Sequence, residues 1–359
     1  MKKILIIALI PFLLIGCKKR DLQIERLAIG SENVVKSTSS IQITVNYTYV
    51  SALKSVVGYV SQNSDMSNAT SANATVSANQ FVVSFDNLAY NTKYYYCFDC
   101  NNGVDIIKTD VQSVTTDFPG LIKSEFSVSD TKKVYFSQGN LQYQASTDTW
   151  RFADNQFIIV GSNNSNISST YDGWIDLFGW GTGDNPTNSS IENNDYITFV
   201  EWGSNAISNG GNASNLWRTM TNDEWDYLFN RRNTTSGIRF TQAEVNGTLG
   251  VIVLPDNWDR NLFTLNNANT GAEYDSNIVT LSDWTDIFEA NGAVFLPAGG
   301  MREGTEVNLP GMRGSYWSAT NYHGVGAYNV YFLGGNIYNP NTVGTYMGNS
   351  VRLVCEVEN

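Results

Sequence analysis

All nine tryptophans of this 359-residue chain lie between Trp150 and Trp317, and residues 21–117 contain none. The tryptophan-free stretch is built instead from alternating Val, Ile, Thr and Tyr. A composition change of this kind marks a boundary between separately folded domains. It falls at Asp117-Phe118-Pro119-Gly120, where Pro and Gly interrupt the pattern. The expected division is a first domain over 22–117, a linker over 118–120 and a second domain over 121–359.

The first domain carries the two-residue period of half-buried β-strands. Apolar residues occupy alternate positions from Ile41 to Tyr49, with Gln, Thr and Asn between them. Two further short strands are expected at Val56–Val60 and Phe81–Phe85, separated by loops rich in Asn, Ser and Ala. Short strands without a helical stretch predict an all-β sandwich.

One segment of this domain resembles a known family. The run Leu88–Tyr96 is similar to the fibronectin type III pattern of Leu, Pro, Thr and Tyr at alternate positions. Tyr94 matches the corner tyrosine of that pattern, whose hydroxyl bonds back to the loop backbone. Val114–Thr116 resembles the closing strand. Tyr90 replaces the usual Pro, and the early-strand Trp is missing. The resemblance implies a spacer or interaction module.

The second domain mixes strands with two expected helices. Thr221 can cap the first, which places Trp225 and Leu228 on one face. The second is expected to follow Ser282 and to end at Gly292. Helices among antiparallel strands indicate an α+β domain. The strand-like runs are 134–136, 250–254, 293–296, 327–332 and 350–355.

Six segments in one order resemble the Fibrobacter succinogenes major paralogous domain and its relatives in bacterial surface lipoproteins. The resemblance implies a C-type-lectin-like fold, related to that of formylglycine-generating enzymes. Those enzymes use two closely spaced cysteines near the C-terminus, whereas this domain has only Cys355, so their activity is not expected. The segments are Val134–Tyr143, Gly173–Gly181, Trp217–Thr219 with Glu224–Trp225, Phe295–Gly300, Tyr316–Thr320 and Ser350–Val354.

The N-terminus has the layout of a secretory signal over residues 1–16. Two lysines precede an apolar run, Ile4–Ile15, that is too short to span a bilayer. Gly16-Cys17 resembles the lipobox of bacterial lipoproteins, which implies lipid attachment at Cys17 and a tether over 17–21. The alternative is an ordinary signal with an incidental cysteine. A lipid-anchored protein of the cell envelope, at the outer membrane, is expected; periplasmic and surface orientations both stay open.

Charge and cysteine usage exclude several classes of function. The formal net charge is −12, so phosphate backbones are repelled and no nucleic-acid partner is expected. Cys97 and Cys100 lie three residues apart in an expected strand and therefore point to opposite faces. His323 is the one histidine, so a Cys/His zinc site is not expected. No metal is assigned, calcium stays open, and no cofactor is expected.

Enzymatic motifs are missing from the sequence. There is no G-x-S-x-G elbow and no P-loop, and Gly179-x-Gly181-x-Gly183 lacks the flanking strand and helix of a nucleotide loop. The chain is therefore expected not to be an enzyme. A hydrolase that uses a pair of carboxylates is the alternative, because acidic residues are plentiful and their separation is not visible in sequence.

A binding site has broader support in the composition. Aromatic faces stack on sugar rings, and amides or carboxylates bond their hydroxyls. Packing in the core is the alternative for each aromatic residue. We expect non-catalytic recognition of a glycan or another surface macromolecule; the alternatives are the hydrolase above and a structural subunit of a surface assembly. The candidate contact residues are Asp256, Asn257, Trp258, Tyr322, His323 and Asn329.

Overall fold

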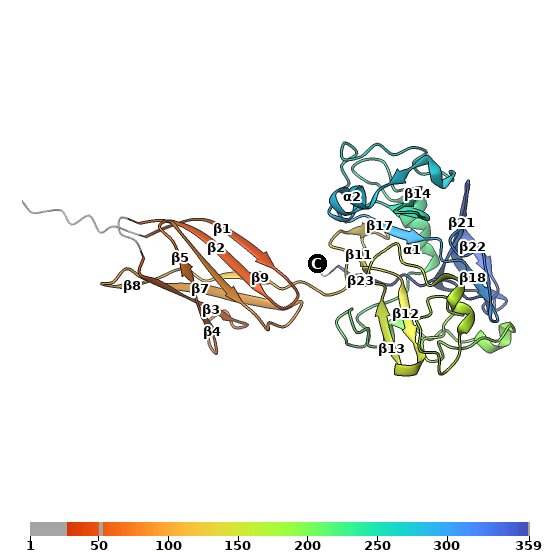
Figure 1. Cartoon of the computed structure of the whole chain (residues 1–359), viewed down its shortest axis with the longest axis horizontal. Helices are drawn as coiled ribbons and strands as arrows, with labels where there is room; N and C mark the ends of the chain where they lie inside the picture. The colour runs from red at the N-terminus through yellow and green to blue at the C-terminus, as the bar shows by residue number, and fades with distance from the viewer. Residues whose placement is uncertain (1–26, 50–52, 358–359) are drawn as a thin grey trace, which may run out of the picture. The chain divides into compact units, whose positions relative to one another are not determined.

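The structure is a computed structural model, and it describes residues 27–49 and 53–357. The chain separates into two compact units after Asp117 (Figure 1), the position at which the composition changes. The signal at 1–16, the lipid site at Cys17 and the tether at 17–21 lie outside the described residues. Within the described part, no helix is long and apolar enough to cross a membrane.

The first unit is a pair of antiparallel sheets. One sheet has the strand order β1-β2-β6-β5, and in the other β4, β3 and β7 follow one another while β8 and β9 both pair with β7. The strands of the first sheet are β1 (Ala28–Lys36), β2 (Ile41–Thr48), β5 (Thr75–Val76) and β6 (Gln80–Phe85). Those of the second are β3 (Ser55–Ser61), β4 (Thr70–Asn73), β7 (Lys93–Asn101), β8 (Ile106–Lys108) and β9 (Gln112–Thr115).

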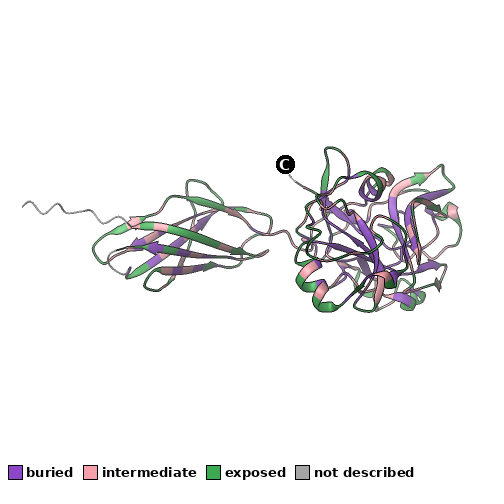
Figure 2. Cartoon of the chain, turned by 90° about the horizontal axis from the view of Figure 1, so that it is seen from above, coloured by how far each residue is buried: buried purple, intermediate pink, exposed green. Residues whose placement is uncertain are grey.

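Alternation along the strands builds the core of this sandwich, as predicted. In β2, Ile41, Ile43 and Val45 are fully buried while the intervening side chains face outward. Figure 2 shows the same alternation of buried and exposed positions. Tyr94 at the start of β7 accepts a hydrogen bond from the backbone N–H of Ala89 at 2.9 Å, which is the bond that the corner pattern predicts.

The regular structure of the second unit is also mostly strand, arranged in several small sheets. Three of them are β10-β11-β23, β12-β13 and β16-β14-β15-β17, and two more are β18-β19 and β20-β21-β22. The first three sheets contain β10 (Phe126–Ser127), β11 (Lys133–Phe136), β12 (Leu141–Gln144), β13 (Thr149–Phe152), β14 (Phe240–Val245), β15 (Thr248–Val253), β16 (Ile278–Val279), β17 (Val294–Pro297) and β23 (Val354–Glu356). The remaining strands are β18 (Met301–Glu303), β19 (Glu306–Asn308), β20 (Arg313–Tyr322), β21 (Gly326–Leu333) and β22 (Asn336–Val343).

The two expected helices are present, with one correction. Helix α1 (Asn222–Asp226) starts at the predicted cap, Thr221, which forms a capping box with Glu224. Helix α2 (Leu281–Asp283) is capped by Thr280, so the predicted start after Ser282 is wrong. Thr280 is the better cap because its side chain and that of the third helical residue, an aspartate, bond each other's backbone N–H groups. Each helix continues as a short π-helix, over Tyr227–Arg231 and Trp284–Glu289.

Aromatic side chains fill the interior of the second unit. Eight of the nine tryptophans are buried, and Trp174 alone is half-buried. Trp225 and Trp284 lie in the core, as their positions on the helices predict. The predicted strand over 350–355 is shorter than expected, because only Val354–Glu356 forms a ladder, with β11. This sheet joins the last described strand to one near the start of the unit.

Candidate functional site

Asp256 and Asn257 do not form a ligand site together. The carboxylate of Asp256 pairs with the guanidinium of Arg232 at 2.9 Å and accepts a hydrogen bond from the hydroxyl of Ser127 at 2.5 Å. Both Asp256 oxygens are therefore held by neighbouring elements of the fold, and the ligand contact expected for Asp256 stays a prediction. Asn257 is exposed beside it and does not line either of the two hollows, of about 710 and 400 Å³, that are described below.

Trp258 is a core residue. Its side chain is 1% exposed, and its ring stacks on Phe288 with centroids 5.3 Å apart and an interplanar angle of 16°. A ring in this position has no accessible face for a sugar. The ligand role expected for Trp258 is therefore wrong, because a contact with a helix thirty residues further along the chain draws it inward.

Tyr322 and Asn329 lie on β20 and β21, and His323 lies in the turn between these strands; only Tyr322 and His323 reach the surface. Tyr322 is half-buried and contacts the rings of His323 and Tyr328, with centroids 4.8 and 5.3 Å away. Asn329 is 1% exposed; its amide donates to the hydroxyl of Ser315 at 2.6 Å and its oxygen accepts from the amide of Asn341 at 2.9 Å. The ligand role expected for Asn329 is thus wrong, since neighbouring strands saturate it.

A different segment of the second unit forms a hollow of about 400 Å³. We call it the loop hollow; it is lined by residues from the segment 180–200. Its floor includes the buried rings of Trp180 and Tyr196, and its rim carries Ile197, which is 74% exposed. The polar rim residues are Asp184, Asn185, Asn188, Asn194 and Asp195.

Long-range bonds hold the loop hollow in place. The indole N–H of Trp180 donates to the carbonyl of Ser318 at 3.0 Å, and its backbone N–H donates to the carbonyl of Thr345 at 2.9 Å. Gly181 adopts φ +68°, and a Cβ there would lie 2.6 Å from the Cα of Phe199, so only glycine fits this close approach. The segment is therefore fixed by partners far away in sequence, and the hollow is preformed.

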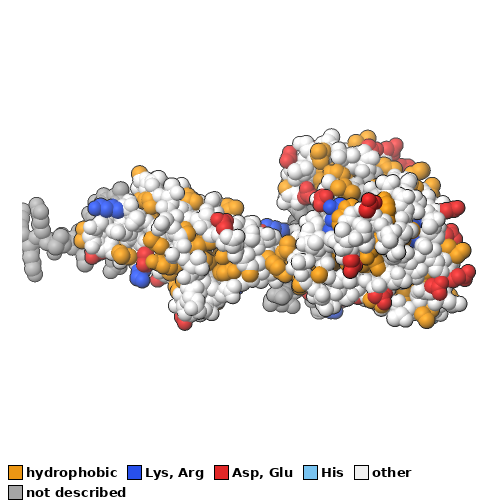
Figure 3. Space-filling view, turned by 60° about the horizontal axis from the view of Figure 1, so that its bottom comes forward, with side chains coloured by type: hydrophobic (Ala, Val, Ile, Leu, Met, Phe, Trp, Pro, Cys, Tyr) orange, Lys and Arg blue, Asp and Glu red, His pale blue; other side chains and the backbone are white. Residues whose placement is uncertain are grey.

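The charge around the loop hollow favours ligands that are not anionic. Asp184 and Asp195 are both exposed at the rim, and no Lys or Arg is among the residues that line the hollow. On the face in Figure 3, acidic side chains are scattered over the second unit. The amides of the rim offer donors and acceptors for hydroxyl groups. The arrangement suits a neutral polyhydroxylated molecule.

A perturbed carboxyl lies elsewhere and cannot touch a substrate. Burial raises the pKa of Asp176 to about 6, although its oxygens accept hydrogen bonds from the backbone of Val160 and the amide of Asn164. Its side chain is fully buried. A catalytic acid must reach the bond that it protonates, so Asp176 is a structural group. In the described part of the chain, no three His, Cys, Asp or Glu side chains gather as a metal site would require.

Sequence reasoning missed the loop hollow and Trp174. The signal for the hollow is the density of Asn and Asp after Gly179-Trp180-Gly181, which neither the nucleotide-loop interpretation nor the family resemblance of this stretch uses. Trp174 stands in a loop next to Gly173 rather than on a helix or strand, which could have separated it from the core tryptophans. The guanidinium of Arg151 lies 3.9 Å from its ring centroid.

Neither a family model nor a curated protein matches the chain. Three solved structures illustrate the weak similarities found. A computationally redesigned β-sandwich protein matches with TM-score 0.22 and 16% identity over 25% of this chain and 93% of its own. The sensor domain of the anti-sigma factor RsgI4 of Pseudobacteroides cellulosolvens matches with TM-score 0.21 and 13% identity over 26% and 94%.

The third is the family 64 laminaripentaose-producing β-1,3-glucanase of Paenibacillus barengoltzii. It matches with TM-score 0.19 and 13% identity, over 39% of this chain and 37% of the glucanase. TM-scores this low carry no argument about the function of the chain, which has to be argued from its own residues.

Proposed function

We propose that this chain is a lipid-anchored cell-envelope protein that recognises neutral carbohydrate through the loop hollow of its second unit. The observation that carries the proposal is the lining of the hollow. Amides, two exposed carboxylates and the exposed side chain of Ile197 line it, so its accessible surface combines hydrogen-bonding groups with an apolar side chain. Hydroxyl groups of a sugar find hydrogen-bond partners there, and its C–H faces find apolar surface.

The proposal includes a fibronectin type III fold for the first unit and a C-type-lectin-like fold for the second. The bond from Ala89 to Tyr94 supports the first. For the second, the segments that carry the resemblance contact one another: the indole of Trp317 donates to the carbonyl of Phe178 at 2.7 Å, and Arg218 and Val354 exchange backbone hydrogen bonds. Four of the six segments are therefore in direct contact with one another.

Binding to polysaccharides tests the recognition role. The full chain is run on native gels that contain neutral glucans or xylan, with Asp184→Ala and Asn194→Ala as test variants. Each variant removes a rim group and should lose about tenfold in affinity, the effect of one strong hydrogen bond. The matched controls are Asp275→Ala and Asn257→Ala, exposed residues that do not line the hollow. Absence of retardation by every polysaccharide, or equal retardation of test and control variants, would contradict the proposal.

Lipid attachment is tested separately. Cells are labelled with a fatty-acid analogue, and the label should appear on the chain and vanish in Cys17→Ser. Proteolysis of whole cells then distinguishes the two orientations, because only a surface protein is cut without permeabilisation. An unlabelled chain would remove the anchor from the proposal and leave carbohydrate recognition unaffected.

The two carboxylates of the loop hollow favour one second candidate, a glycan hydrolase. Asp184 and Asp195 line the same hollow, and paired carboxylates are the usual machinery of glycoside hydrolysis. Release of reducing ends from the polysaccharides that bind, lost in both Asp184→Asn and Asp195→Asn, would establish it. Binding without release of reducing ends leaves recognition as the function.

A further inference from the structure

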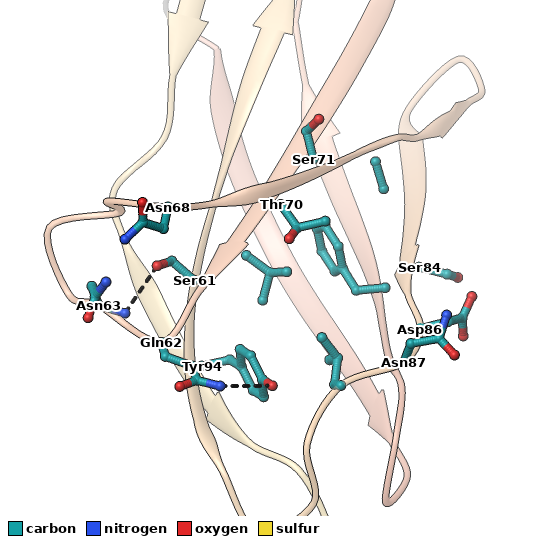
Figure 4. Close-up of a pocket in the computed structure, with 14 residues that line it drawn as sticks. Ser61, Gln62, Asn63, Asn68, Thr70, Ser71, Ser84, Asp86, Asn87 and Tyr94 are labelled. Atoms are coloured by element: carbon teal, nitrogen blue, oxygen red, sulfur yellow. Dashed lines mark hydrogen bonds between the residues drawn. The ribbon is translucent and has the colours of Figure 1, made fainter.

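The sandwich unit contains a hollow of its own, of about 710 Å³. It opens between the two sheets, with β3 and β4 on one side and the end of β6 on the other (Figure 4). We call it the sandwich hollow. Its volume lies within the range of small-molecule sites. No residue of the loop hollow takes part in it, since all its lining residues belong to the first unit.

The floor of the sandwich hollow is apolar. Val60 and Phe85, from the two facing sheets, are buried and close the bottom. Ala72 and Leu88 are half-buried, so part of their apolar surface faces the hollow. The accessible apolar surface of Ala72 and Leu88 can cover the C–H face of a sugar ring.

The rim of the sandwich hollow carries exposed polar side chains from both sides. Asn68 and Thr70 come from the β3–β4 side, and Asp86 and Asn87 come from the segment after β6 (Figure 4). No hydrogen bond within the described residues engages these four side chains, so their donors and acceptors are available to a ligand. Asp86 is the single charged residue among those that line the hollow, and no lysine or arginine faces it.

Hydrogen bonds hold the turn between β3 and β4, which carries one side of the rim. The hydroxyl of Ser61 donates to the carbonyl of Ser67 at 2.6 Å, and the carboxylate of Asp65 accepts from the backbone N–H of Ser67 at 2.9 Å. Hydrogen bonds from the hydroxyl and the backbone N–H of Ser67 lower the pKa of Asp65. Asn68 and Asn87 adopt φ of 56° and 59°, the left-handed conformation that asparagine tolerates. A preformed rim loses little conformational entropy on binding.

We infer that the sandwich hollow is a second binding site, for a short neutral oligosaccharide. Hydroxyl groups would bond the amides and the carboxylate of the rim, while a ring face would rest on the apolar floor. Anionic ligands are disfavoured, because the one charge at the site is negative. The inference goes beyond the function proposed above, since it places a carbohydrate site in the other unit, on other residues.

Calorimetric titration of the full chain with cellotriose, laminaritriose, maltotriose and xylotriose tests this site. Asn68→Gly and Asn87→Gly each delete an amide without backbone strain, because glycine adopts positive φ freely. Each should weaken binding of the trisaccharide that binds by about tenfold. Asn91→Gly is the matched control: its φ is 44°, it is exposed, and it does not line the hollow. Its affinity should equal that of the wild type.

A variant that fills the sandwich hollow distinguishes loss of binding from loss of folding. Ala72→Leu adds apolar volume to the floor, so it should abolish binding while the thermal unfolding midpoint of the first unit stays at or above that of the wild type. The inference is overturned if none of the four trisaccharides gives heat, or if Ala72→Leu and both test variants bind as the wild type does.

Failure here is distinguishable from failure of the loop hollow. All tryptophans lie in the second unit, so a ligand in the sandwich hollow should leave tryptophan fluorescence unchanged, whereas a ligand over Trp180 should change it. Asp184→Ala should leave sandwich-hollow binding intact. If the heat of binding is lost in Asp184→Ala and is unchanged in Ala72→Leu, all carbohydrate binding belongs to the second unit, and the inference is overturned.

Discussion

The guanidinium of Arg232, whose side chain is fully buried, is neutralised by the carboxylate of Asp256 at 2.9 Å. Arg232 follows the helical turn after α1, and it also donates to the carbonyls of Leu228 and Leu254 at 2.9 and 2.6 Å. The pair therefore ties the end of a helix to the end of β15. Burial lowers the pKa of Arg232 to about 10, although Asp256 raises it in part. The arginine stays charged at neutral pH and depends on this carboxylate.

Asp256→Asn should destabilise the second unit by about 3 kcal/mol, because it leaves a buried guanidinium without a counter-charge. Urea unfolding followed by tryptophan fluorescence measures the change. The control is Asp226→Asn, which removes the partner of Arg231, a surface arginine whose side chain is 69% exposed; it should cost less than about 1 kcal/mol. Equal losses of stability in the two variants would show that the carboxylate of Asp256 does not compensate the buried charge of Arg232.

Tyr94→Phe should destabilise the first unit by about 1 kcal/mol, since the backbone N–H of Ala89 loses its acceptor while the ring stays in place. Unfolding in urea is followed by circular dichroism. Tyr95→Phe is the control, because Tyr95 is half-buried on the opposite face of β7. Its contact is with the ammonium of Lys93, which lies 5.2 Å from the ring centroid, so the ring that makes this contact is kept when the hydroxyl is removed. A loss in Tyr95→Phe as large as in Tyr94→Phe would contradict the corner bond.

Local patterns predicted the elements better than they predicted the site. The alternation in β2 and the cap at Thr221 depend on neighbouring residues, so both are visible in sequence. The sequence predicts the cap of α2 two residues late, because Thr280 and Ser282 are both good capping residues. Only the hydrogen bonds between Thr280 and Asp283 identify Thr280 as the cap. Two strongly patterned units could therefore be located without any knowledge of their tertiary contacts.

The candidate site depends on contacts that no local pattern encodes. Trp258 follows polar residues and looks like a loop residue, yet it stacks on Phe288. The loop hollow is held by bonds such as that from the backbone N–H of Thr345 to the side-chain oxygen of Asn193, 2.8 Å long and joining residues 152 positions apart. Exposure of a polar or aromatic side chain is set by such pairings, and therefore only the structure separates binding candidates from core residues.

The buried carboxyl of Asp176 should make the stability of the second unit fall as the pH rises. Its pKa is about 6 in the folded protein against an ordinary aspartate pKa of 3.8, so the folded state binds the proton more tightly. The resulting stabilisation is complete below about pH 4 and is lost as the pH rises through about 6. Across this window the loss amounts to about 3 kcal/mol.

Asp176→Asn removes this titration, so the unfolding free energy of the wild type minus that of the variant should decrease from pH 4 to pH 7. Any destabilisation by the substitution that does not depend on pH cancels when the two differences in unfolding free energy are compared. Asp172→Asn, at an exposed carboxylate four residues earlier, should give a difference that stays constant. A constant difference for Asp176→Asn as well would mean that the carboxylate is already ionised at pH 4 in the folded protein.

The cysteine thiols of the described residues should be unreactive in the native protein. Cys97, Cys100 and Cys355 are all unpaired, and the first two point to opposite faces of β7, as their spacing predicts. Burial raises the pKa of Cys100 to about 11 and that of Cys355 to about 12, with the adjacent carboxylate of Glu356 as a second cause for Cys355. At pH 8 only about one in a thousand Cys100 thiols is then ionised, and the thiolate is the reactive form.

Titration with a chromogenic disulfide reagent at pH 8 checks this expectation. In Cys17→Ser the three remaining thiols should all react in urea, and without urea Cys97, which is half-buried and has a pKa raised mainly by burial, should react first and slowly. In Cys17→Ser with Cys97→Ser, no thiol should react before unfolding. A fast-reacting thiol in that double variant would show that Cys100 or Cys355 is open to solvent, which is incompatible with the packing of the strand that holds it.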